Sequence, residues 1–301
     1  RALVLPAENV EGVLPASVEI ARADITDAAA VSAAMRGAGS VFHLAAVVGD
    51  WGEDDLFQRV TVGGTRNVMN AAADNDTRVL LASSVVVYGD SVHTKVCNED
   101  LPYGNALGPY SRTKQQQEQL AWEIARARDV KLTVVRPTNV YGPGSRPWVH
   151  DVVDQLKTGT PSLIGGGEIN AGLAHVDNVV DIFVRAACTD AAIGRAYNAS
   201  DGSDVTWRQY FSDIARLIGA KPPASIPWIA AKLGAYACET TWRLLGLERR
   251  PPITHEALNL VGSDHRVPIE RARRELGYTP LVDYAAGIRS VAEYLKQAHL
   301  A

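Results

Sequence analysis

The chain has 301 residues, of which 47% are hydrophobic and 21% are charged, as in an ordinary soluble globular protein. Its net charge of -4 gives no basic surface for nucleic acid, and its three cysteines and seven histidines lack the spacing of a disulfide framework or metal site. These values exclude a disordered chain and a nucleic-acid-binding protein, and they predict no metal and a reducing, cytoplasmic setting.

The first half alternates short apolar runs with longer stretches of helical periodicity. Strands that are apolar along their length, each followed by a helix, are typical of a parallel sheet covered on both faces. We therefore predict an α/β fold with a doubly wound parallel sheet, whose ligands bind at the carboxyl ends of the strands. The predicted strands are Ala2–Leu5, Glu19–Ala23, Ser40–Ala45, Arg78–Ala82 and Lys131–Val135, and the predicted helices are Ala28–Arg36, Leu56–Asp74 and Tyr110–Arg128.

The second half is less regular and mainly helical. After Pro222 the composition shifts to Trp, Ala and Leu, which predicts a smaller helical lobe over the site. We expect a dinucleotide-binding domain over residues 1–160 and a substrate-binding lobe over 161–301, with 176–200 returning to the main sheet. The predicted elements are helices at Val149–Lys157, Val176–Ala187, Thr206–Ile218 and Tyr284–Gln297, and strands at Pro161–Ile164 and Ala196–Ala199.

The longest apolar stretch, Ile226–Leu247, is interrupted by charged residues at Lys232, Glu239 and Arg243. These charges make it too polar to span a bilayer. It is compatible with a helix that lies on a membrane surface or one that covers an apolar pocket.

A dinucleotide-binding fold normally opens with a strand, a glycine-rich turn and a helix that holds the pyrophosphate. No such unit precedes Arg1, and the run Gly165-Gly-Gly167 comes too late in the chain. Because that first strand is central in the doubly wound order, we expect roughly 20–30 further residues upstream.

A tyrosine and a lysine stand one helical turn apart in Tyr110-Ser-Arg-Thr-Lys114. A lysine cation favours the phenolate and lowers the phenol pKa, so that Tyr110 could exchange a proton with an alcohol or carbonyl. Upstream, the predicted strand that leads into Ser83 and Ser84 places a hydroxyl at the ligand edge of the sheet, where it could bond the reacting oxygen. Downstream, Val134-Val-Arg-Pro137 enters a Pro/Gly turn at the same edge.

In this order and spacing, the chain resembles the extended short-chain dehydrogenase/reductase family, with its Rossmann-like fold, over nearly its whole length. One departure is Thr61, where that family usually has Asn. The matching elements are Asp24-Ile25, Val41-Phe-His-Leu-Ala-Ala46, Gly64-Thr-Arg-Asn-Val68, Ser83-Ser84 with Tyr88-Gly89, Tyr110 with Lys114, Arg136-Pro137 with Tyr141-Gly-Pro143, and His175-Val-Asp-Asn178.

The resemblance implies a nicotinamide-dependent oxidoreductase in which Ser84, Tyr110 and Lys114 are catalytic. It implies that NAD or NADP is the cofactor, the preference between them being undetermined, and that two helices per subunit, Leu56–Asp74 and Tyr110–Arg128, form a homodimer. The residues expected at the cofactor are Asp24, Ile25, Leu44, Ala45, Ala46, Tyr110, Lys114, Pro137 and Val140, and those expected at the substrate are Val48, Trp51, Ser84, Asn139 and Trp148.

Several segments, including Ala46–Gly52 and Arg271–Pro280, resemble the 3β-hydroxysteroid and sterol dehydrogenase-like branch. That branch interconverts secondary alcohols and ketones on apolar sterol or β-hydroxy/β-keto acyl substrates. A nucleotide-sugar 4-epimerase would share the catalytic trio, but Ala171 and Ser263-Asp-His-Arg266 replace the arginine-bearing elements with which epimerases grip a diphosphate. A sugar dehydratase needs an acidic pair where Val85-Val86 stands, and a non-catalytic cofactor sensor would commonly lack the Tyr or Lys.

Overall fold

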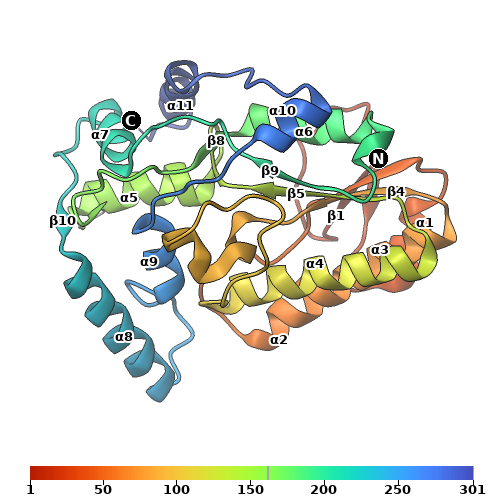
Figure 1. The fold of residues 1–301 in the computed structure, drawn as a ribbon, viewed down its shortest axis with the longest axis horizontal. Coiled ribbons are helices and arrows are strands. Elements are labelled where there is room, and N and C mark those ends of the chain that lie inside the picture. The colour runs from red at the N-terminus through yellow and green to blue at the C-terminus, as the bar shows by residue number, and fades with distance from the viewer. Residues whose placement is uncertain (161–162, 301) are drawn as a thin grey trace.

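The computed structural model describes residues 1–160 and 163–300, and it confirms the predicted α/β class (Figure 1). Its main sheet has four parallel strands in the order β3-β4-β5-β9, so the chain returns to it at β9. The strands are β3 (Ser40–His43), β4 (Arg78–Ala82), β5 (Leu132–Pro137) and β9 (Ala196–Ala199).

Helices cover both faces of this sheet, and the central strand β4 shows why its sequence is apolar throughout. Val79 and Leu81 pack against α3 (Gly64–Asp74) and α4 (Pro109–Arg128), whereas Leu80 points to the other face. There it packs with α6 (Val176–Ala187) and α10 (Glu270–Leu276). Successive residues of a strand face opposite sides, so a strand buried on both faces needs apolar residues at every position.

The first two strands, β1 (Ala2–Val4) and β2 (Ile20–Arg22), form a separate parallel pair. Among residues 1–160 and 163–300, β1 is bonded only to β2, and β3 only to β4. Leu3 and Phe42, one on each of these unshared edges, are exposed. The expectation of a further strand upstream stays a prediction.

The helical run predicted at Leu56–Asp74 begins slightly earlier and contains a wider turn. It consists of α2 (Asp54–Phe57), a π-helical segment over Gln58–Gly63 and then α3. Gly64, at the start of α3, lies against Ile25, since a Cβ there would meet the Ile25 side chain at 2.8 Å. α1 (Ala28–Met35) packs against α3 on the same face of the molecule.

In the second half the sequence predicted four of the helices, gave the longest one, α8, only as part of a helical lobe, and missed several short elements. The first two residues of the strand predicted at Pro161–Ile164 lie outside the described residues. Short paired strands escape sequence patterns because two or three residues show no periodicity. The elements are α5 (Asp151–Thr158), α7 (Trp207–Leu217), α8 (Trp228–Leu244), α9 (His255–Val261), α11 (Tyr284–Gln297), and the strand pairs β6 (Asn139–Tyr141) with β8 (Leu173–His175) and β7 (Leu163–Ile164) with β10 (Ser225–Ile226).

α5, α7 and α11 share one hydrophobic cluster around Tyr141 and Trp207, although α5 precedes residue 160. Where the boundary between the two predicted domains falls stays a prediction. α8 lies at the edge of the molecule (Figure 1) and exposes apolar side chains at Ile229, Leu233 and Tyr236. No helix in the part of the chain that the structure describes is both long enough and apolar enough to cross a membrane.

Candidate active site

The catalytic edge begins where β4 ends. Ser83 and Ser84 follow Ala82 directly, and Ser84 is the N-cap of the 3-10 segment η2 (Val85–His93). The Oγ of Ser84 accepts a hydrogen bond from Val86 N at 3.3 Å. Ser84 is 9% exposed, so its hydroxyl lies at the carboxyl end of β4 and is largely shielded from solvent. The strand-end position predicted from sequence is the one observed.

The structure brings Tyr110 and Ser84 together. Tyr110 lies in the first turn of α4, and its phenol lies close enough to Ser84 for that hydroxyl to lower its pKa. Burial is the larger effect and raises the pKa of Tyr110 to about 12, and the carboxylate of Glu256 adds to the rise. The net shift is opposite to the one expected from the sequence, and it keeps the phenol protonated at neutral pH.

Lys114 follows one turn later, with its Nζ 5.9 Å from the centre of the Tyr110 ring. The ammonium donates to the carbonyl oxygen of Ala82 at 2.8 Å and to Gln117 Oε1 at 2.9 Å. Burial lowers the pKa of Lys114 to about 8. An ammonium has three N–H groups, so one donor is left for a ligand among the partners that the described residues supply.

A chain of buried hydrogen bonds that runs through Gln117 supports the Lys114 ammonium. Gln117 Nε2 donates to Thr65 Oγ1 at 2.8 Å, and Thr65 Oγ1 is 2.7 Å from His43 Nε2. Burial, with the Lys114 charge, lowers the pKa of His43 to about 3, so this histidine is neutral and serves the packing. Thr61, the departure from the family pattern, accepts a hydrogen bond from Val47 N at 3.0 Å and so fixes the loop that follows β3.

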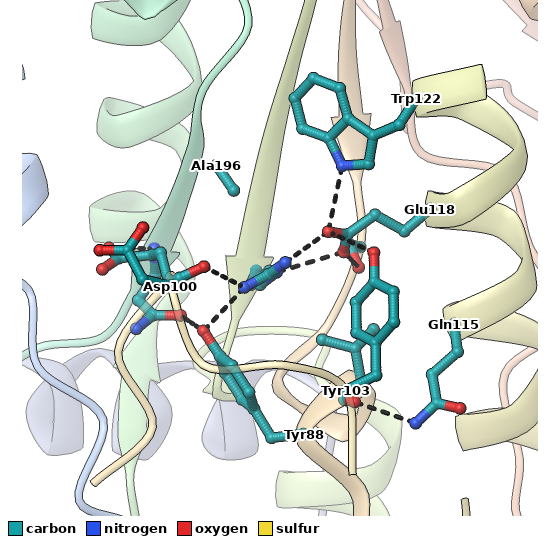
Figure 2. Close-up of polar contacts among 12 residues, drawn as sticks. Tyr88, Asp100, Tyr103, Gln115, Glu118, Trp122 and Ala196 are labelled. Atoms are coloured by element: carbon teal, nitrogen blue, oxygen red, sulfur yellow. Dashed lines mark hydrogen bonds and ion pairs between the residues drawn. The ribbon is translucent and has the colours of Figure 1, made fainter. Parts of the chain in front are cut away.

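A second buried network joins α4 to the sheet one turn beyond Lys114 (Figure 2). Glu118 is fully buried and accepts from the Arg136 guanidinium at 2.5 and 3.2 Å, and from Ser83 Oγ at 2.5 Å. Tyr103 and Trp122 donate to the same carboxylate, and Arg136 continues to Tyr88 at 3.0 Å. Glu118 therefore fixes the helix of Tyr110 to β5 through Arg136 and to the end of β4 through Ser83.

Sequence reasoning did not assign Arg136 and Glu118 to this role. A signal was present in both cases. Arg136 is a cation inside the apolar run Val134–Pro137, and Glu118 stands at one more helical turn on the face of Tyr110 and Lys114. A charge in a buried strand requires a partner, but the sequence does not say which of many acidic residues supplies it.

Residues 5–200 match the NAD dependent epimerase/dehydratase family. The chain belongs to this family. It is 31% identical to a 2-alkyl-3-oxoalkanoate reductase of Stenotrophomonas maltophilia over 280 residues, covering 89% of this chain and 84% of that protein.

It is also 29% identical to a 3β-hydroxysteroid-dehydrogenase/decarboxylase of Arabidopsis thaliana, covering 96% of this chain and 70% of that protein. Among solved structures, that of gox2253 superposes with a TM-score of 0.80 at 23% identity, over 98% of this chain and 90% of that one, which shows the fold.

The residues expected at an NAD(P) cofactor of this family line the ends of the parallel strands. Leu44 and Ala45 follow β3 and are exposed, which is unusual for apolar residues at a strand end and suits a face that a nicotinamide nucleotide covers. Asp24 is exposed, with Oδ1 accepting from Thr26, and Ile25 is buried beneath α3. Ala46, Pro137 and Val140 are half-buried nearer the catalytic edge. Together with the free donor of Lys114, this arrangement fits the cofactor.

The residues expected at the substrate fall into two sets. Val48 is 70% exposed and Trp51 half-buried, on the loop after β3, where Trp51 Nε1 lies 3.4 Å from Leu247 O of the helical lobe. Asn139 is buried, and its amide donates to Ala171 O at 2.7 Å. Trp148 packs on Trp207 with ring centres 5.0 Å apart. The structure thus gives Asn139 and Trp148 packing partners, and their contact with substrate stays a prediction.

A cavity of about 590 Å³ lies beside the catalytic edge and not at it. It is bounded by η2, the loop before α4, α8 and α9, and none of the trio lines it. Its lining includes His93, Tyr103, Trp228, Lys232 and His255. This cavity is therefore separate from the strand edge at which Ser84 and Tyr110 meet.

Proposed function

We propose that this protein is an NAD(P)-dependent oxidoreductase that interconverts a ketone and a secondary alcohol on an apolar substrate of the β-keto acyl or 3β-hydroxysteroid type. The observation that carries the proposal is the placement of Ser84, at the carboxyl end of β4, beside the protonated Tyr110 of α4, with Lys114 one turn away. Bound NAD(P)H supplies the hydride for this chemistry.

The protein's own part is to hold the carbonyl and move one proton. Ser84 Oγ donates a hydrogen bond to the carbonyl oxygen, which orients it and stabilises the negative charge that develops there. Tyr110 donates its phenolic proton to the same oxygen as the alcohol forms, because its raised pKa keeps it protonated at neutral pH. Lys114 orients the cofactor ribose through its remaining N–H and stabilises the tyrosinate that is left.

Apolar side chains around the edge support an apolar substrate. Val85 and Val86, directly after Ser84, are buried, and Val48 is exposed on the loop that follows β3. Relatives support the same class, since the reductase of Stenotrophomonas maltophilia is named for 2-alkyl-3-oxoalkanoates and the protein of Arabidopsis thaliana for 3β-hydroxysteroids. We infer a carbonyl at the 3-position of an alkyl chain or ring system.

A nucleotide-sugar 4-epimerase would use the same trio, but among the positions with which epimerases grip a diphosphate only Arg266 is a cation here. Ala171 is fully buried, Ser263 and His265 are buried, and Arg266 is bound to Asp264 at 3.4 Å. A charged diphosphate needs bidentate arginine or lysine partners, so we place this activity second. A cofactor sensor without turnover is disfavoured by the retained Tyr110 and Lys114.

The function is tested by incubating the purified protein with NADH or NADPH and a panel of substrates. The panel contains β-keto acyl esters, 3-ketosteroids and UDP-sugars, followed by nicotinamide absorbance, with a separate assay for epimerised sugar. We expect turnover of the first two classes. Turnover of UDP-sugars alone would contradict the proposal.

Peripheral membrane contact through the exposed apolar face of α8, a homodimer through α3 and α4, and a cytoplasmic location remain hypotheses. Vesicle flotation tests the first and light scattering the second. Loss of binding on replacing Leu233 by Glu is the result expected if α8 contacts lipid.

A further inference from the structure

The helical lobe reaches the catalytic helix through one buried carboxylate. Glu256, in the first turn of α9, is 3% exposed, and its Oε1 accepts a hydrogen bond from Ser111 N at 2.6 Å. Ser111 is the residue after Tyr110, and the amide of Tyr110 also faces this carboxylate. A side chain 145 positions away in sequence thus binds the N-terminus of α4.

α4 needs such a partner because its own sequence supplies none. Its N-cap is Gly108, which has no side chain to accept from the free amides, and its first turn contains no acidic residue. The first amides of a helix and its macrodipole favour an anion at this position. Glu256 provides the missing hydrogen-bond acceptor from outside the helix.

The contact is close enough to require glycine at position 108. A Cβ on Gly108 would lie 2.0 Å from Glu256 Oε2 and 3.2 Å from the Glu256 Cβ. The backbone of Gly108 is extended (φ -158°), so close approach and not backbone freedom is the reason for glycine. Any side chain at Gly108 has to displace the carboxylate.

The lobe that carries Glu256 is itself fixed to the loop after β3. Thr254, the N-cap of α9, donates to Asp50 Oδ2 at 2.6 Å, and Arg250 binds both Asp50 oxygens at 2.5 and 2.6 Å. Asp50 adjoins Trp51, which we expect at the substrate. The same short segment of the lobe therefore touches the substrate loop and the catalytic helix.

We propose that Glu256 is a positioning residue, which holds the N-terminus of α4 and thereby places Tyr110 against Ser84 when the helical lobe is docked. This inference rests on the proposed function, in which Tyr110 moves the proton. It assigns to Glu256 no contact with substrate or cofactor.

The charge of Glu256 has a measurable consequence at Tyr110. Burial, with a contribution from Asp50, raises the pKa of Glu256 to about 7, and the ionised carboxylate in turn raises the pKa of Tyr110. The titratable groups that face Glu256 are Asp50, whose charge is paired with Arg250, and the neutral Tyr110 phenol. Removing the charge without changing the shape should therefore ease ionisation of Tyr110.

The test is the pH profile of kcat for alcohol oxidation, in wild type and in Glu256→Gln. The glutamine keeps an oxygen for Ser111 N and removes the charge. We expect the rise of kcat with pH to move about one pH unit lower. Glu239→Gln is the matched control, because Glu239 binds the amide of His255 at 2.7 Å, at the N-terminus of α9, and touches neither α4 nor Tyr110. Its profile should match wild type.

Gly108→Ala is the second variant and displaces the carboxylate by volume. We expect kcat to fall about tenfold or more, with the Kd for NADH within about twofold of wild type, because a small misplacement of a catalytic group is costly. Profiles of Glu256→Gln that superimpose on wild type, or a Gly108→Ala enzyme with unchanged kcat, would overturn the inference. Turnover by Tyr110→Phe would instead overturn the proposed function, so the two failures are distinguishable.

Discussion

Glu118→Ala should destabilise the protein strongly, because it removes the anion from a buried ion pair and leaves the cation behind. The side chains of Arg136 and Glu118 are 6% and 0% exposed. Without the carboxylate, the acceptors left to the guanidinium among the described residues are Tyr88 and the carbonyl oxygen of Glu99, at 3.0 and 3.2 Å. The hydroxyl of Ser83 also loses its acceptor.

The expected loss follows from these contacts. Breaking a buried pair by removing one partner costs about 3–5 kcal/mol, and an orphaned buried hydroxyl adds about 1 kcal/mol. Tyr103 and Trp122 are half-buried, so water can replace their bonds and they add little. We expect a loss of about 4–6 kcal/mol in all. Replacing Arg136 and Glu118 together by Met leaves no unpaired charge, and we expect this double variant to be less destabilised than Glu118→Ala.

Urea unfolding followed by far-UV circular dichroism measures the effect. Glu123→Ala is the control on the same helix, because Glu123 is exposed, and it should stay within about 0.5 kcal/mol of wild type. A Glu118→Ala protein within about 1 kcal/mol of wild type would refute the reasoning. So would a double variant that loses as much as the two single variants combined.

Three further predictions concern the site and its surroundings. Lys114→Met should lower kcat/KM about 10²-fold or more without unfolding the protein, since it removes the cation beside Tyr110 and the donor to the cofactor; circular dichroism and steady-state kinetics check both parts. Between pH 5 and 8, the free energy of unfolding of wild type should fall by roughly 3 kcal/mol relative to that of Glu256→Gln. Folding raises the pKa of Glu256 from 4.5 to about 7. The unfolded state therefore releases this proton at lower pH than the folded state, and rising pH favours unfolding. Asp50→Asn should raise the KM for substrate several-fold by loosening the loop of Trp51, whereas Asp54→Asn, which breaks an exposed pair with Arg112, should not.

The positions of Ser84, Tyr110 and Lys114 in the fold, and the sheet itself, could be predicted because their signals are local. Ser84 ends an apolar strand, and Tyr110 and Lys114 lie one turn apart on one helix. A few adjacent residues in the sequence are therefore enough to predict where each of them lies. The covered parallel sheet likewise follows from continuous apolar strands that alternate with helices.

The contacts between distant segments could not be predicted. Glu256 meets Ser111 across 145 positions, and Asp50 meets Arg250 across 200. The local sequence around either residue does not indicate which distant residue it contacts. The pKa of Tyr110 was misjudged for the same reason: the sequence shows the lysine four residues on, but burial and Glu256 come from the folded lobe.

Tyr110→Phe tests the central claim most directly. The matched control is Tyr236→Phe, in the exposed face of α8. Ketone reduction is measured with saturating NADH or NADPH, and cofactor binding by fluorescence titration. We predict a loss of about 10³-fold in kcat with cofactor affinity nearly unchanged, because only the proton donor is removed. A Tyr110→Phe enzyme that keeps more than about a tenth of wild-type turnover would contradict the account.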